Sequence, residues 1–478
     1  MDKLNLTMLM DFYELTMSNG YLETGFENKI ACFDMFFRRV PDGGGFAIMA
    51  GLEQLIEYIK NIKFEQKDIE YLRSKKIFSE RFLEYLKNFK FTCDVWAVKE
   101  GTPIFPGEPI VKVIGPVIEA QFIETMLLLI INHQSLIATK ANRIVRAAKG
   151  RPVMEFGSRR AQGVYGALHG ARAAYIGGCA GTACTISDIT DGIPALGTMA
   201  HSWIQMFPTE YEAFKTYANI YPDNCTFLID TYNVLNSGLK NAIRVFKEEI
   251  IAKGHKVGGV RIDSGDITYL SKKVREILDE NGLQDVKICA SNSLDEYIIR
   301  DLLNQGACID TFGVGERLIT SKSEPVFGGV YKLVSIIEGE VEIPKIKLSE
   351  NVSKITTPCN KKLVRLYSAA NNKAIADVLL TDKESIPNGE DYEIFDPIHT
   401  WKRKTITNYY AKDLLTKIFD KGNCVYTSPD VHEIKNYCKE QIDTLWDEVK
   451  RFENPHNYYV DFSQKLWDIK NELLNQHK

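Results

Sequence analysis

Three stretches of the chain differ in how apolar and polar positions alternate. In the first, 1–130, the run 29–40 alternates at every second residue and predicts a strand. The run 51–62 repeats its apolar residues at helical spacing and predicts an amphipathic helix. Short apolar runs within 95–115 are separated by Gly-Thr-Pro and Pro-Gly turns and predict a small antiparallel β unit. We therefore expect an α+β domain at this end of the chain.

From about residue 150 to 335, short apolar segments alternate with helical patterns. The predicted strands are 153–156, 193–197, 225–230, 257–263, 286–291 and 309–315. One helix, beginning at Ile267, carries an apolar stripe, and Gly282 marks its end. Such alternation favours a parallel sheet with helices outside it. Six repeats favour an α/β barrel, complete or incomplete, and a doubly wound open sheet is the competing architecture.

The C-terminal part of the chain loses this rhythm. Apolar runs at 331–339, 363–370 and 375–380 predict strands, and a Lys/Glu-rich tail from about residue 430 predicts helix. We therefore expect three domains: an N-terminal α+β domain over 1–130, an α/β barrel over 131–340, and an appended region over 341–478 that packs on the other two.

Composition narrows the class of protein. The net charge of −4 is small, which argues against a nucleic-acid-binding protein with its basic face. No apolar run reaches the length of about 18 residues that indicates a membrane span. The first residues lack the basic segment and long apolar core of a secretory signal. Ten scattered cysteines without a CxxC pair indicate reduced thiols, so we expect a cytoplasmic protein.

Polar residues follow nearly every predicted strand of the 150–335 stretch. They are Gly157, Ser158, Arg159, Arg160, Thr198, His201, Asp230, Thr231, Arg261, Asp263, Ser264, Asp266, Ser291, Asn292, Gly313 and Gly315. Any one of them is explained by helix capping or a turn, but carboxyl ends of parallel strands converge on active sites. Arginine and glycine-rich turns bind phosphate, and carboxylates face Mg²⁺ or a developing positive charge. This combination indicates a phosphorylated sugar that reacts at its anomeric carbon.

Several motifs in this order along the chain resemble one known family. They are DFYELTM (11–17), EFGSRRAQG (155–163), GTMAHSW (197–203), LIDTYN (228–233), VRIDSGD (260–266), FGVGERLITS (312–321) and GGVYKLV (328–334). Together they are similar to the motifs of the nicotinate phosphoribosyltransferases, although FGVG alone would be weak. The resemblance implies an irregular, seven-stranded α/β barrel beside an N-terminal domain. It also implies a homodimer whose active sites are shared between subunits.

The reaction implied by the resemblance joins nicotinate to 5-phosphoribosyl 1-diphosphate (PRPP), coupled to ATP hydrolysis in NAD biosynthesis. His201 matches the histidine that the family phosphorylates from ATP as co-substrate, with Mg²⁺ as the cofactor. A ring nitrogen can accept a phosphoryl group when the other nitrogen is held by a partner. By similarity we expect Asp230 to be that partner. The alternative for His201 is a hydrogen-bonded core histidine.

Further roles follow position by position from the same resemblance. Phe156 matches an aromatic residue that stacks on the pyridine ring, and Tyr13 matches its counterpart from the neighbouring subunit. Arg261 and Thr198 match residues at the nicotinate carboxylate, and Asp263 faces the ribose or its developing charge. PRPP and its phosphates are expected to contact Arg38 of the other subunit, Arg159, Ser291, Gly313, Gly315, Thr320 and Ser321. Core packing is the alternative for the aromatic residues, and exposure at the surface for Arg38 and Arg159.

The choice of substrate rests on Ala183. Relatives that use nicotinamide carry an Asp after the corresponding Gly-Thr, and a carboxylate there would repel nicotinate. Quinolinate enzymes are shorter and lack the phosphorylated histidine. Glu316 stands where Thr is usual beside the phosphate loop, and Asn233 replaces a usual Asp. The first departure weakens the phosphate assignment, and the second leaves the Mg²⁺ ligands unknown.

Two other classes of function are open. A sugar-phosphate aldolase or isomerase of the barrel type often needs a lysine at a strand end, and the predicted strand ends carry none. A non-catalytic binding relative predicts damage to the His201, Asp230 and Arg261 set, which is intact.

Overall fold

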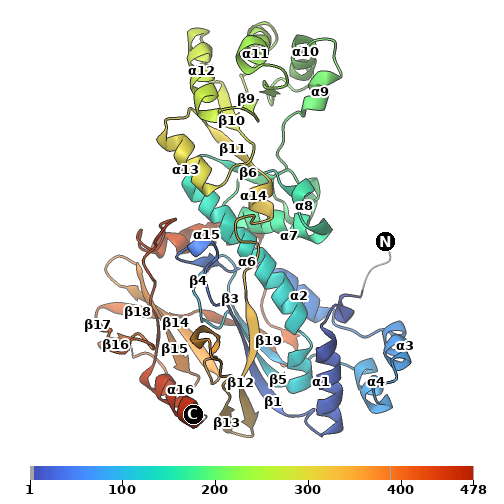
Figure 1. Ribbon diagram of the computed structural model, residues 1–478, viewed down its shortest axis with the longest axis vertical. Helices are drawn as coiled ribbons and strands as arrows, with labels where there is room; N and C mark the ends of the chain where they lie inside the picture. Colours follow the sequence, from blue (N-terminus) through green and yellow to red (C-terminus); the bar gives the residue numbers. More distant parts are fainter. Residues whose placement is uncertain (1–4, 388, 477–478) are drawn as a thin grey trace. The chain divides into compact units, whose positions relative to one another are not determined.

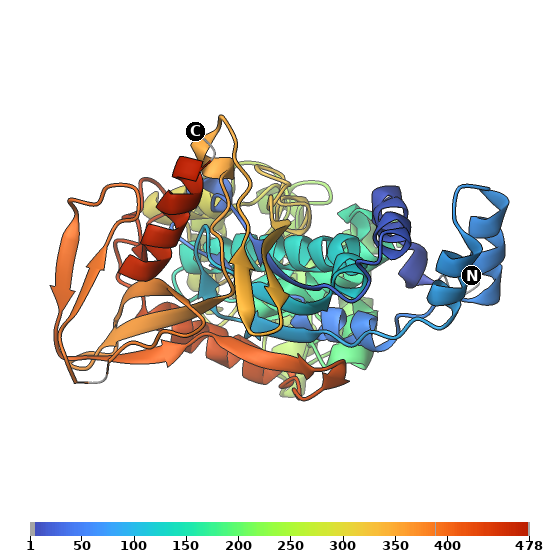
Figure 2. The same cartoon turned by 90° about the horizontal axis from the view of Figure 1, so that it is seen from below.

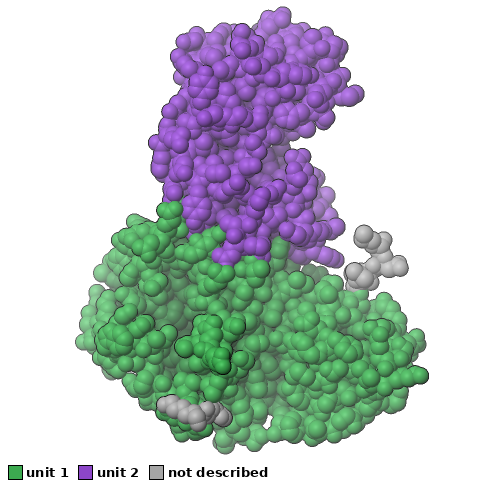
Figure 3. Space-filling model, in the orientation of Figure 1, with its two compact units in different colours: residues 1–136, 326–478 green, residues 137–325 purple. Residues whose placement is uncertain are grey.

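The computed structural model describes residues 5–387 and 389–476, which form two compact units (Figures 1 and 3). Unit 1 combines residues up to 136 with those from 326 onward, and unit 2 comprises 137–325. The first and last parts of the chain thus share one unit. The predicted division into 1–130, 131–340 and 341–478 stays a prediction.

Unit 1 is built on a seven-stranded sheet in the order β13-β12-β1-β5-β3-β19-β20. Its strands are β1 (Ile30–Phe36), β3 (Asp94–Val98), β5 (Val111–Pro116), β12 (Val330–Glu338), β13 (Val341–Pro344), β19 (Leu415–Asp420) and β20 (Asn423–Cys424). All of these pairings are antiparallel. The small antiparallel β unit predicted around 95–115 is therefore the centre of a larger sheet. It is flanked by β1 on one side and on the other by β19 from the far end of the chain, a pairing that local patterns do not reveal.

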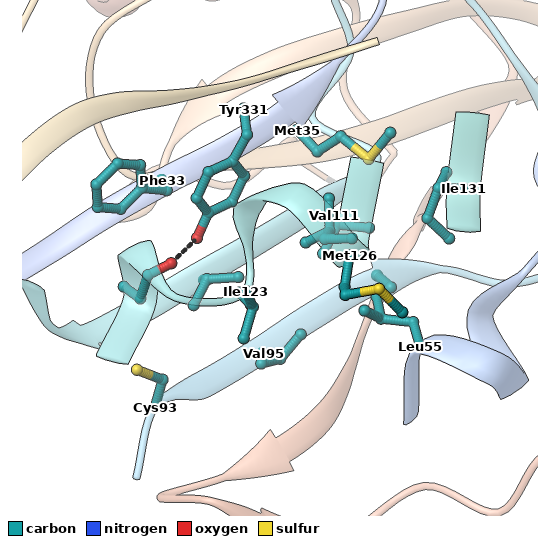
Figure 4. Packing of buried hydrophobic residues seen from close by; sticks show 14 of the residues in the cluster. Phe33, Met35, Leu55, Cys93, Val95, Val111, Ile123, Met126, Ile131 and Tyr331 are labelled. Carbon is teal, nitrogen blue, oxygen red and sulfur yellow. Dashed lines mark hydrogen bonds between the residues drawn. The ribbon is translucent and has the colours of Figure 1, made fainter. Parts of the chain in front are cut away.

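The core of unit 1 joins strands that are distant in sequence (Figure 4). The rings of Phe33 on β1 and Tyr331 on β12 stack with centroids 4.8 Å apart. The Tyr331 hydroxyl donates a hydrogen bond to the carbonyl of Ala120 at 2.8 Å, so its buried polar atom is satisfied. Aliphatic side chains such as Val95 and Val111 complete the layer.

Helices flank this sheet in the N-terminal part of unit 1. They are α1 (Phe12–Glu23), α2 (Leu52–Lys60), α3 (Gln66–Ser74), α4 (Glu80–Lys87), α5 (Val117–Gln121) and α6 (Glu124–Ala147), the last of which carries the chain into unit 2. Residues 117–147 are long and apolar enough to span a membrane by length and composition alone. Of their most apolar window, 67% is buried within the protein, which is typical of a core helix.

The C-terminal part of unit 1 adds a second sheet in the order β18-β14-β15-β21. Its strands are β14 (Lys361–Ser368), β15 (Ala374–Thr381), β18 (Tyr409–Asp413) and β21 (Val460–Phe462). The pairs β16 (Tyr392–Phe395) with β17 (Arg403–Ile406), and β2 (Ala47–Ile48) with β4 (Pro103–Ile104), are separate ribbons. Helices α15 (Val431–Thr444) and α16 (Gln464–Gln476) follow, and α16, in red in Figure 2, contacts β15.

Unit 2 contains a parallel sheet of six strands in the order β7-β6-β11-β10-β9-β8. The strands are β6 (Val153–Glu155), β7 (Gly181–Thr182), β8 (Thr226–Leu228), β9 (Gly259–Ile262), β10 (Lys287–Ala290) and β11 (Thr311–Val314). The helices are α7 (Gly163–Ile176), α8 (Thr185–Asp191), α9 (His201–Gln205), α10 (Glu210–Ile220), α11 (Leu239–Val245), α12 (Ile267–Glu280), α13 (Glu296–Asn304) and α14 (Glu316–Ile319). The predicted alternation of parallel strands and helices is thus present.

A closed barrel is not found within the described residues. The predicted strand 193–197 contributes only one bridge, between Thr182 and Ala195, and β8 ends the sheet on its other side. The segment between them forms α9 and α10 instead of extended chain. Apart from this gap, neighbours along the sheet follow chain order, with β11 beside β6.

Candidate active site

His201 opens α9 and contacts residues from two other strand ends. Its Nδ1 lies 3.1 Å from Thr231 Oγ1, and its Nε2 lies 3.9 Å from Asp263 Oδ2. The side chain is 41% exposed, so the ring is open to a reactant. Among the described residues, the ring contacts Thr231 and Asp263 rather than the expected Asp230. This position differs from that of a fully buried core histidine.

Arg261 and Asp263 form the centre of the site at the end of β9. The Arg261 guanidinium donates to Ser291 Oγ at 3.0 Å and to Thr198 Oγ1 at 2.5 Å, and lies 3.3 Å from Asp263 Oδ2. The Ser291 hydroxyl donates to the other Asp263 oxygen at 2.5 Å. Four strand-end segments therefore converge on one network with His201 at its edge.

Asp230, after β8, accepts hydrogen bonds from the segment that carries Asp263. Its Oδ2 accepts hydrogen bonds from the Asp263 amide at 3.2 Å and from the Ser264 hydroxyl at 2.5 Å. Its Oδ1 is buried and has no hydrogen-bond partner among the described residues. A buried carboxylate oxygen without a donor is costly, so a cation or a donor on a substrate fits there.

The described residues contain no cluster of three or more His, Cys, Asp or Glu side chains suited to a metal ion. Magnesium in phosphate-processing sites is commonly held by one or two carboxylates together with phosphate oxygens. Asp230 fits that pattern through its free oxygen. Asn233 does not provide a free ligand, because its Oδ1 accepts from the Asn236 amide at 2.8 Å and caps the following turn.

Phe156 follows β6 and forms one wall of the site. The Arg261 guanidinium carbon lies 6.0 Å from the centre of its ring. A Cβ added at Gly313 would lie 2.6 Å from the ring, and one at Gly315 would lie 3.1 Å from the Phe156 carbonyl oxygen. These two glycines thus permit close packing against Phe156, a requirement separate from the expected phosphate contacts.

Glu155, which was not selected from the sequence, forms hydrogen bonds that fix the backbone next to Phe156. Its buried carboxylate accepts from the Thr182 hydroxyl at 2.6 Å and from the Gly157 amide. Burial raises the pKa of Glu155, although both hydrogen bonds oppose that shift. An acidic residue inside an otherwise apolar strand was the available signal, since such a residue is rarely buried without a purpose.

The segment after β11 uses its hydroxyl groups internally. Thr320 Oγ1 donates to the Glu316 carbonyl at 2.7 Å, and Ser321 Oγ donates to the Glu324 carbonyl at 3.0 Å. Lys322 Nζ lies 2.7 Å from the Glu316 carboxylate and lowers the pKa of Glu316. The negative charge of Glu316, which stands where threonine is usual, is therefore balanced by Lys322. Phosphate contacts by Thr320 and Ser321 stay a prediction and require these hydroxyls to reorient.

The two arginines after Phe156 differ in their surroundings. Arg160 lies 4.0 Å from the Glu316 carboxylate. Arg159, on the 3₁₀ turn Ser158–Arg160, is exposed and has no ion pair among the described residues. Of the two, Arg159 is the one whose guanidinium is free for an incoming anion.

Tyr13 and Arg38 belong to unit 1. Tyr13 lies on α1 with 43% of its surface exposed, and burial of its hydroxyl together with Glu124 raises its pKa. Arg38 is half-buried after β1, its guanidinium carbon 5.9 Å from the Phe36 ring centre. Their expected roles in a partner subunit's site stay predictions.

Comparison with known proteins decides the family. Residues 8–132 match the N-terminal domain model of nicotinate phosphoribosyltransferase, and 360–470 match the C-terminal domain model. The nicotinate phosphoribosyltransferase of Bacillus subtilis is 43% identical over 476 residues, covering 99% of this chain and 96% of the relative. The chain belongs to the nicotinate phosphoribosyltransferase family. Its sequence resemblance is thereby confirmed.

Other members of the nicotinate phosphoribosyltransferase family agree with this assignment. The enzyme of Caenorhabditis elegans is 34% identical, covering 100% of this chain and 94% of the relative. The crystal structure of human nicotinic acid phosphoribosyltransferase matches with a TM-score of 0.85 at 27% identity, covering 98% of this chain and all of that one. These relatives span unit 2, which the two domain models leave unmatched, so the site lies within the shared fold.

Proposed function

We propose that this enzyme transfers the phosphoribosyl group of PRPP to nicotinate, with ATP hydrolysis coupled through a phosphohistidine at His201. The products are nicotinate mononucleotide and pyrophosphate, a step of NAD biosynthesis by salvage. The observation that carries this proposal is the network of His201, Asp263 and Arg261 at adjoining strand ends. This network supports the proposal because a histidine, a carboxylate and a guanidinium lie close together, which are the groups that the proposed reaction needs.

His201 is arranged to accept a phosphoryl group on Nε2. When the ring carries its proton on Nδ1, that N–H donates to Thr231 Oγ1 at 3.1 Å and the Nε2 lone pair is free. Nε2 then attacks the γ-phosphorus of ATP, the bond to the bridging oxygen breaks, and ADP leaves. Thr231 therefore takes the orienting role that the sequence suggested for Asp230. Hydrolysis of the phosphoimidazole later returns phosphate and free His201.

Nicotinate fits between Arg261 and Phe156. A guanidinium binds a carboxylate in a fork geometry, and an aromatic face suits an electron-poor pyridine ring. Thr198 and Ser291 already fix the guanidinium from two directions, so it is oriented before substrate arrives. Ala183 is exposed after β7 and adds no carboxylate that would favour an amide substrate.

Asp263 and Asp230 are the acidic residues proposed for the ribosyl half of the reaction. Bond breaking at the anomeric carbon of PRPP develops positive charge, which a carboxylate such as Asp263 stabilises. When bound, Mg²⁺ would neutralise charge on the pyrophosphate, and Asp230 Oδ1 is the protein oxygen best placed to hold it. Arg159 and the backbone at Gly313 and Gly315 are the proposed phosphate contacts.

The proposal extends to assembly and location. A homodimer would allow Tyr13 and Arg38 of one subunit to complete the site of the other. Unit 2 would then act as an irregular α/β barrel whose strand ends carry the reaction. All ten cysteines are unpaired thiols, which supports a cytoplasmic enzyme.

The test is phosphorylation of the purified enzyme by γ-³²P-labelled ATP. We expect acid-labile, base-stable label on the wild type and none on His201→Ala, whereas the matched control His169→Ala in the same unit keeps it. His201→Ala is expected to lose ATP coupling while retaining weak ATP-independent transfer. Label on His201→Ala, or a variant that no longer melts cooperatively, would instead support a structural histidine.

The same preparation separates the competing functions. A sugar-phosphate aldolase or isomerase, or a non-catalytic relative, predicts no ATP-dependent label and no nicotinate mononucleotide. A nicotinamide-type enzyme predicts the label but prefers the amide when both substrates are supplied with PRPP. Product analysis by chromatography with each substrate therefore separates a nicotinate enzyme from a nicotinamide-type enzyme and from the classes that form no mononucleotide.

A further inference from the structure

Unit 1 contains a cavity of about 430 Å³ whose lining includes none of the unit 2 network residues, although Arg38, proposed above as a PRPP contact, contributes to its wall. It is lined by residues of β1 and the segment after it, the turn 106–109, β15, the segment 352–357, β21 and α16. The red helix α16 in Figure 2 is the element that contributes its C-terminal wall. A volume of this size is typical of sites for small organic ligands.

Most of the cavity wall is apolar. Phe36, Leu379, Phe462, Trp467 and Leu474 contribute aromatic and aliphatic surface from four separate elements. Such a lining removes water from an apolar ligand body and stabilises its binding. Phe36 is the last residue of β1 and is adjacent in the chain to the buried core residue Met35. This part of the wall therefore belongs to the folded sheet.

The cavity wall carries more basic than acidic side chains. One acid, Asp34, faces three cations, Arg38, Lys361 and Lys470. Lys361 is fully used, because its ammonium lies 2.7 Å from Asp34 Oδ2 and donates to the carbonyls of Thr357, Pro358 and Cys359 at 2.7–3.1 Å. Asp34 is therefore committed to Lys361 and does not neutralise the other two.

Lys470 on α16 has no acidic partner among the described residues. Its ammonium contacts Thr357 Oγ1 at 3.3 Å and lies 5.2 Å from the centre of the Phe462 ring. Burial, together with the charge of Lys361, lowers the pKa of Lys470 to about 8. A half-buried ammonium beside a second ammonium is unfavourable unless an anion joins it.

We propose that this cavity binds a small organic monocarboxylate with an apolar body, its carboxylate on Lys470 and its body against Phe462 and Trp467. The buried Oδ1 of Asp34, which has no donor among the described residues, adds a place for a hydroxyl or N–H group of the ligand. The carboxylate supplies the missing counter-charge, and the aromatic walls supply the apolar contact. A purely apolar ligand would leave Lys470 unpaired, which excludes it as the preferred occupant.

The test is calorimetric titration of the full-length wild-type enzyme with 4-phenylbutyrate, using 4-phenylbutan-1-ol as the neutral counterpart. We expect saturable binding of the acid and at least tenfold weaker binding of the alcohol. Lys470→Met should weaken binding of the acid at least tenfold and leave binding of the alcohol unchanged. Lys470→Arg should retain binding of the acid. Each variant is first shown to melt at the wild-type temperature, and Phe462→Leu serves as a second variant that tests the wall.

Two outcomes would overturn the proposal. Equal affinity for the acid and the alcohol would remove the role of charge, and unchanged acid binding in Lys470→Met would remove the role of this residue. Titrations with saturating nicotinate and PRPP, and with His201→Ala, should give the same affinity. If nicotinate displaced 4-phenylbutyrate, the acid would be binding at the catalytic site, which would contradict binding in a separate cavity. Failure of the phosphohistidine proposal would leave this binding result intact.

Discussion

At the scale of single residues, the structure brings together several side chains that the sequence places after predicted strands. Thr198, His201, Arg261, Asp263 and Ser291 were selected from the sequence, and the structure joins them in one network. The roles of Thr231 and Glu155 were not predictable in this way. Neither a hydroxyl group that contacts a histidine nor a buried acid that binds a turn produces a repeating pattern in the sequence, because the fold determines which group it contacts.

Replacing Arg261 tests the proposed nicotinate contact. Arg261→Ala removes a charge-assisted contact of about 1.5–3 kcal/mol, so KM for nicotinate should rise about 10- to 100-fold. KM for PRPP should change little. Steady-state kinetics with each substrate varied in turn measures both constants. Arg160→Ala is the matched control, and equal increases for the two substrates would refute the assignment of Arg261.

At the scale of elements, regular helices and strands were predicted and irregular ones were not. The helical segment after Asp230 is irregular, since α11 is flanked by π-type turns at Val234–Gly238 and Phe246–Ile250. A Cβ at Gly238 would lie 1.9 Å from the Ile229 carbonyl oxygen, so the first turn follows from close packing beside Asp230. Two-residue strands such as β7 were missed because two residues show no periodicity.

Helix α1 gives a prediction about pH and stability. Glu14 at its N-terminus is buried, accepts from the Asp11 amide at 3.2 Å, and burial raises its pKa to about 7. A raised native pKa means that the native state binds more protons than the unfolded state, so this group stabilises below pH 4.5 and loses that contribution as pH rises to about 7.

The corresponding variant is Glu14→Gln, which cannot ionise. Its free energy of unfolding, measured relative to wild type by urea titration, should increase steadily between about pH 4.5 and 7. Glu57→Gln on α2, an exposed position, is the control. A difference between variant and wild type that is constant across this range would contradict a buried, titrating Glu14.

At the scale of the whole molecule, the sequence indicated the class and the family but not the composition of unit 1. The N-terminal strand β1 pairs with β12 across about 300 residues, as Ile30 opposite Ile337 shows. Strand β3 likewise pairs with β19, as Val98 opposite Leu415 shows. Alternation identifies a strand but not its neighbour, so a distant pairing has to be seen in coordinates.

This pairing predicts that the unit 1 part of residues 1–325 does not fold alone. Without β12 and β19, the strands β1 and β3 each lose one neighbour and expose core side chains such as Phe33. We expect the fragment to aggregate, or to show in circular dichroism the unfolding transition of unit 2 without that of unit 1. Co-expression with residues 326–478 should restore the transition of unit 1. A fragment that melts alone at the temperature of the intact enzyme would contradict the shared sheet.

Strand β12 pairs with β1 one place in from the end strand β13 of the unit 1 sheet, and this also bears on how the protein is made. A ribosome that has finished β1 must add the whole of unit 2 before the neighbouring strand emerges. At about 5–20 residues per second, that delay is roughly 15 to 60 seconds. Unit 2 can therefore complete its own core while the first strands still wait for their partners, and molecular chaperones have that interval in which to bind them.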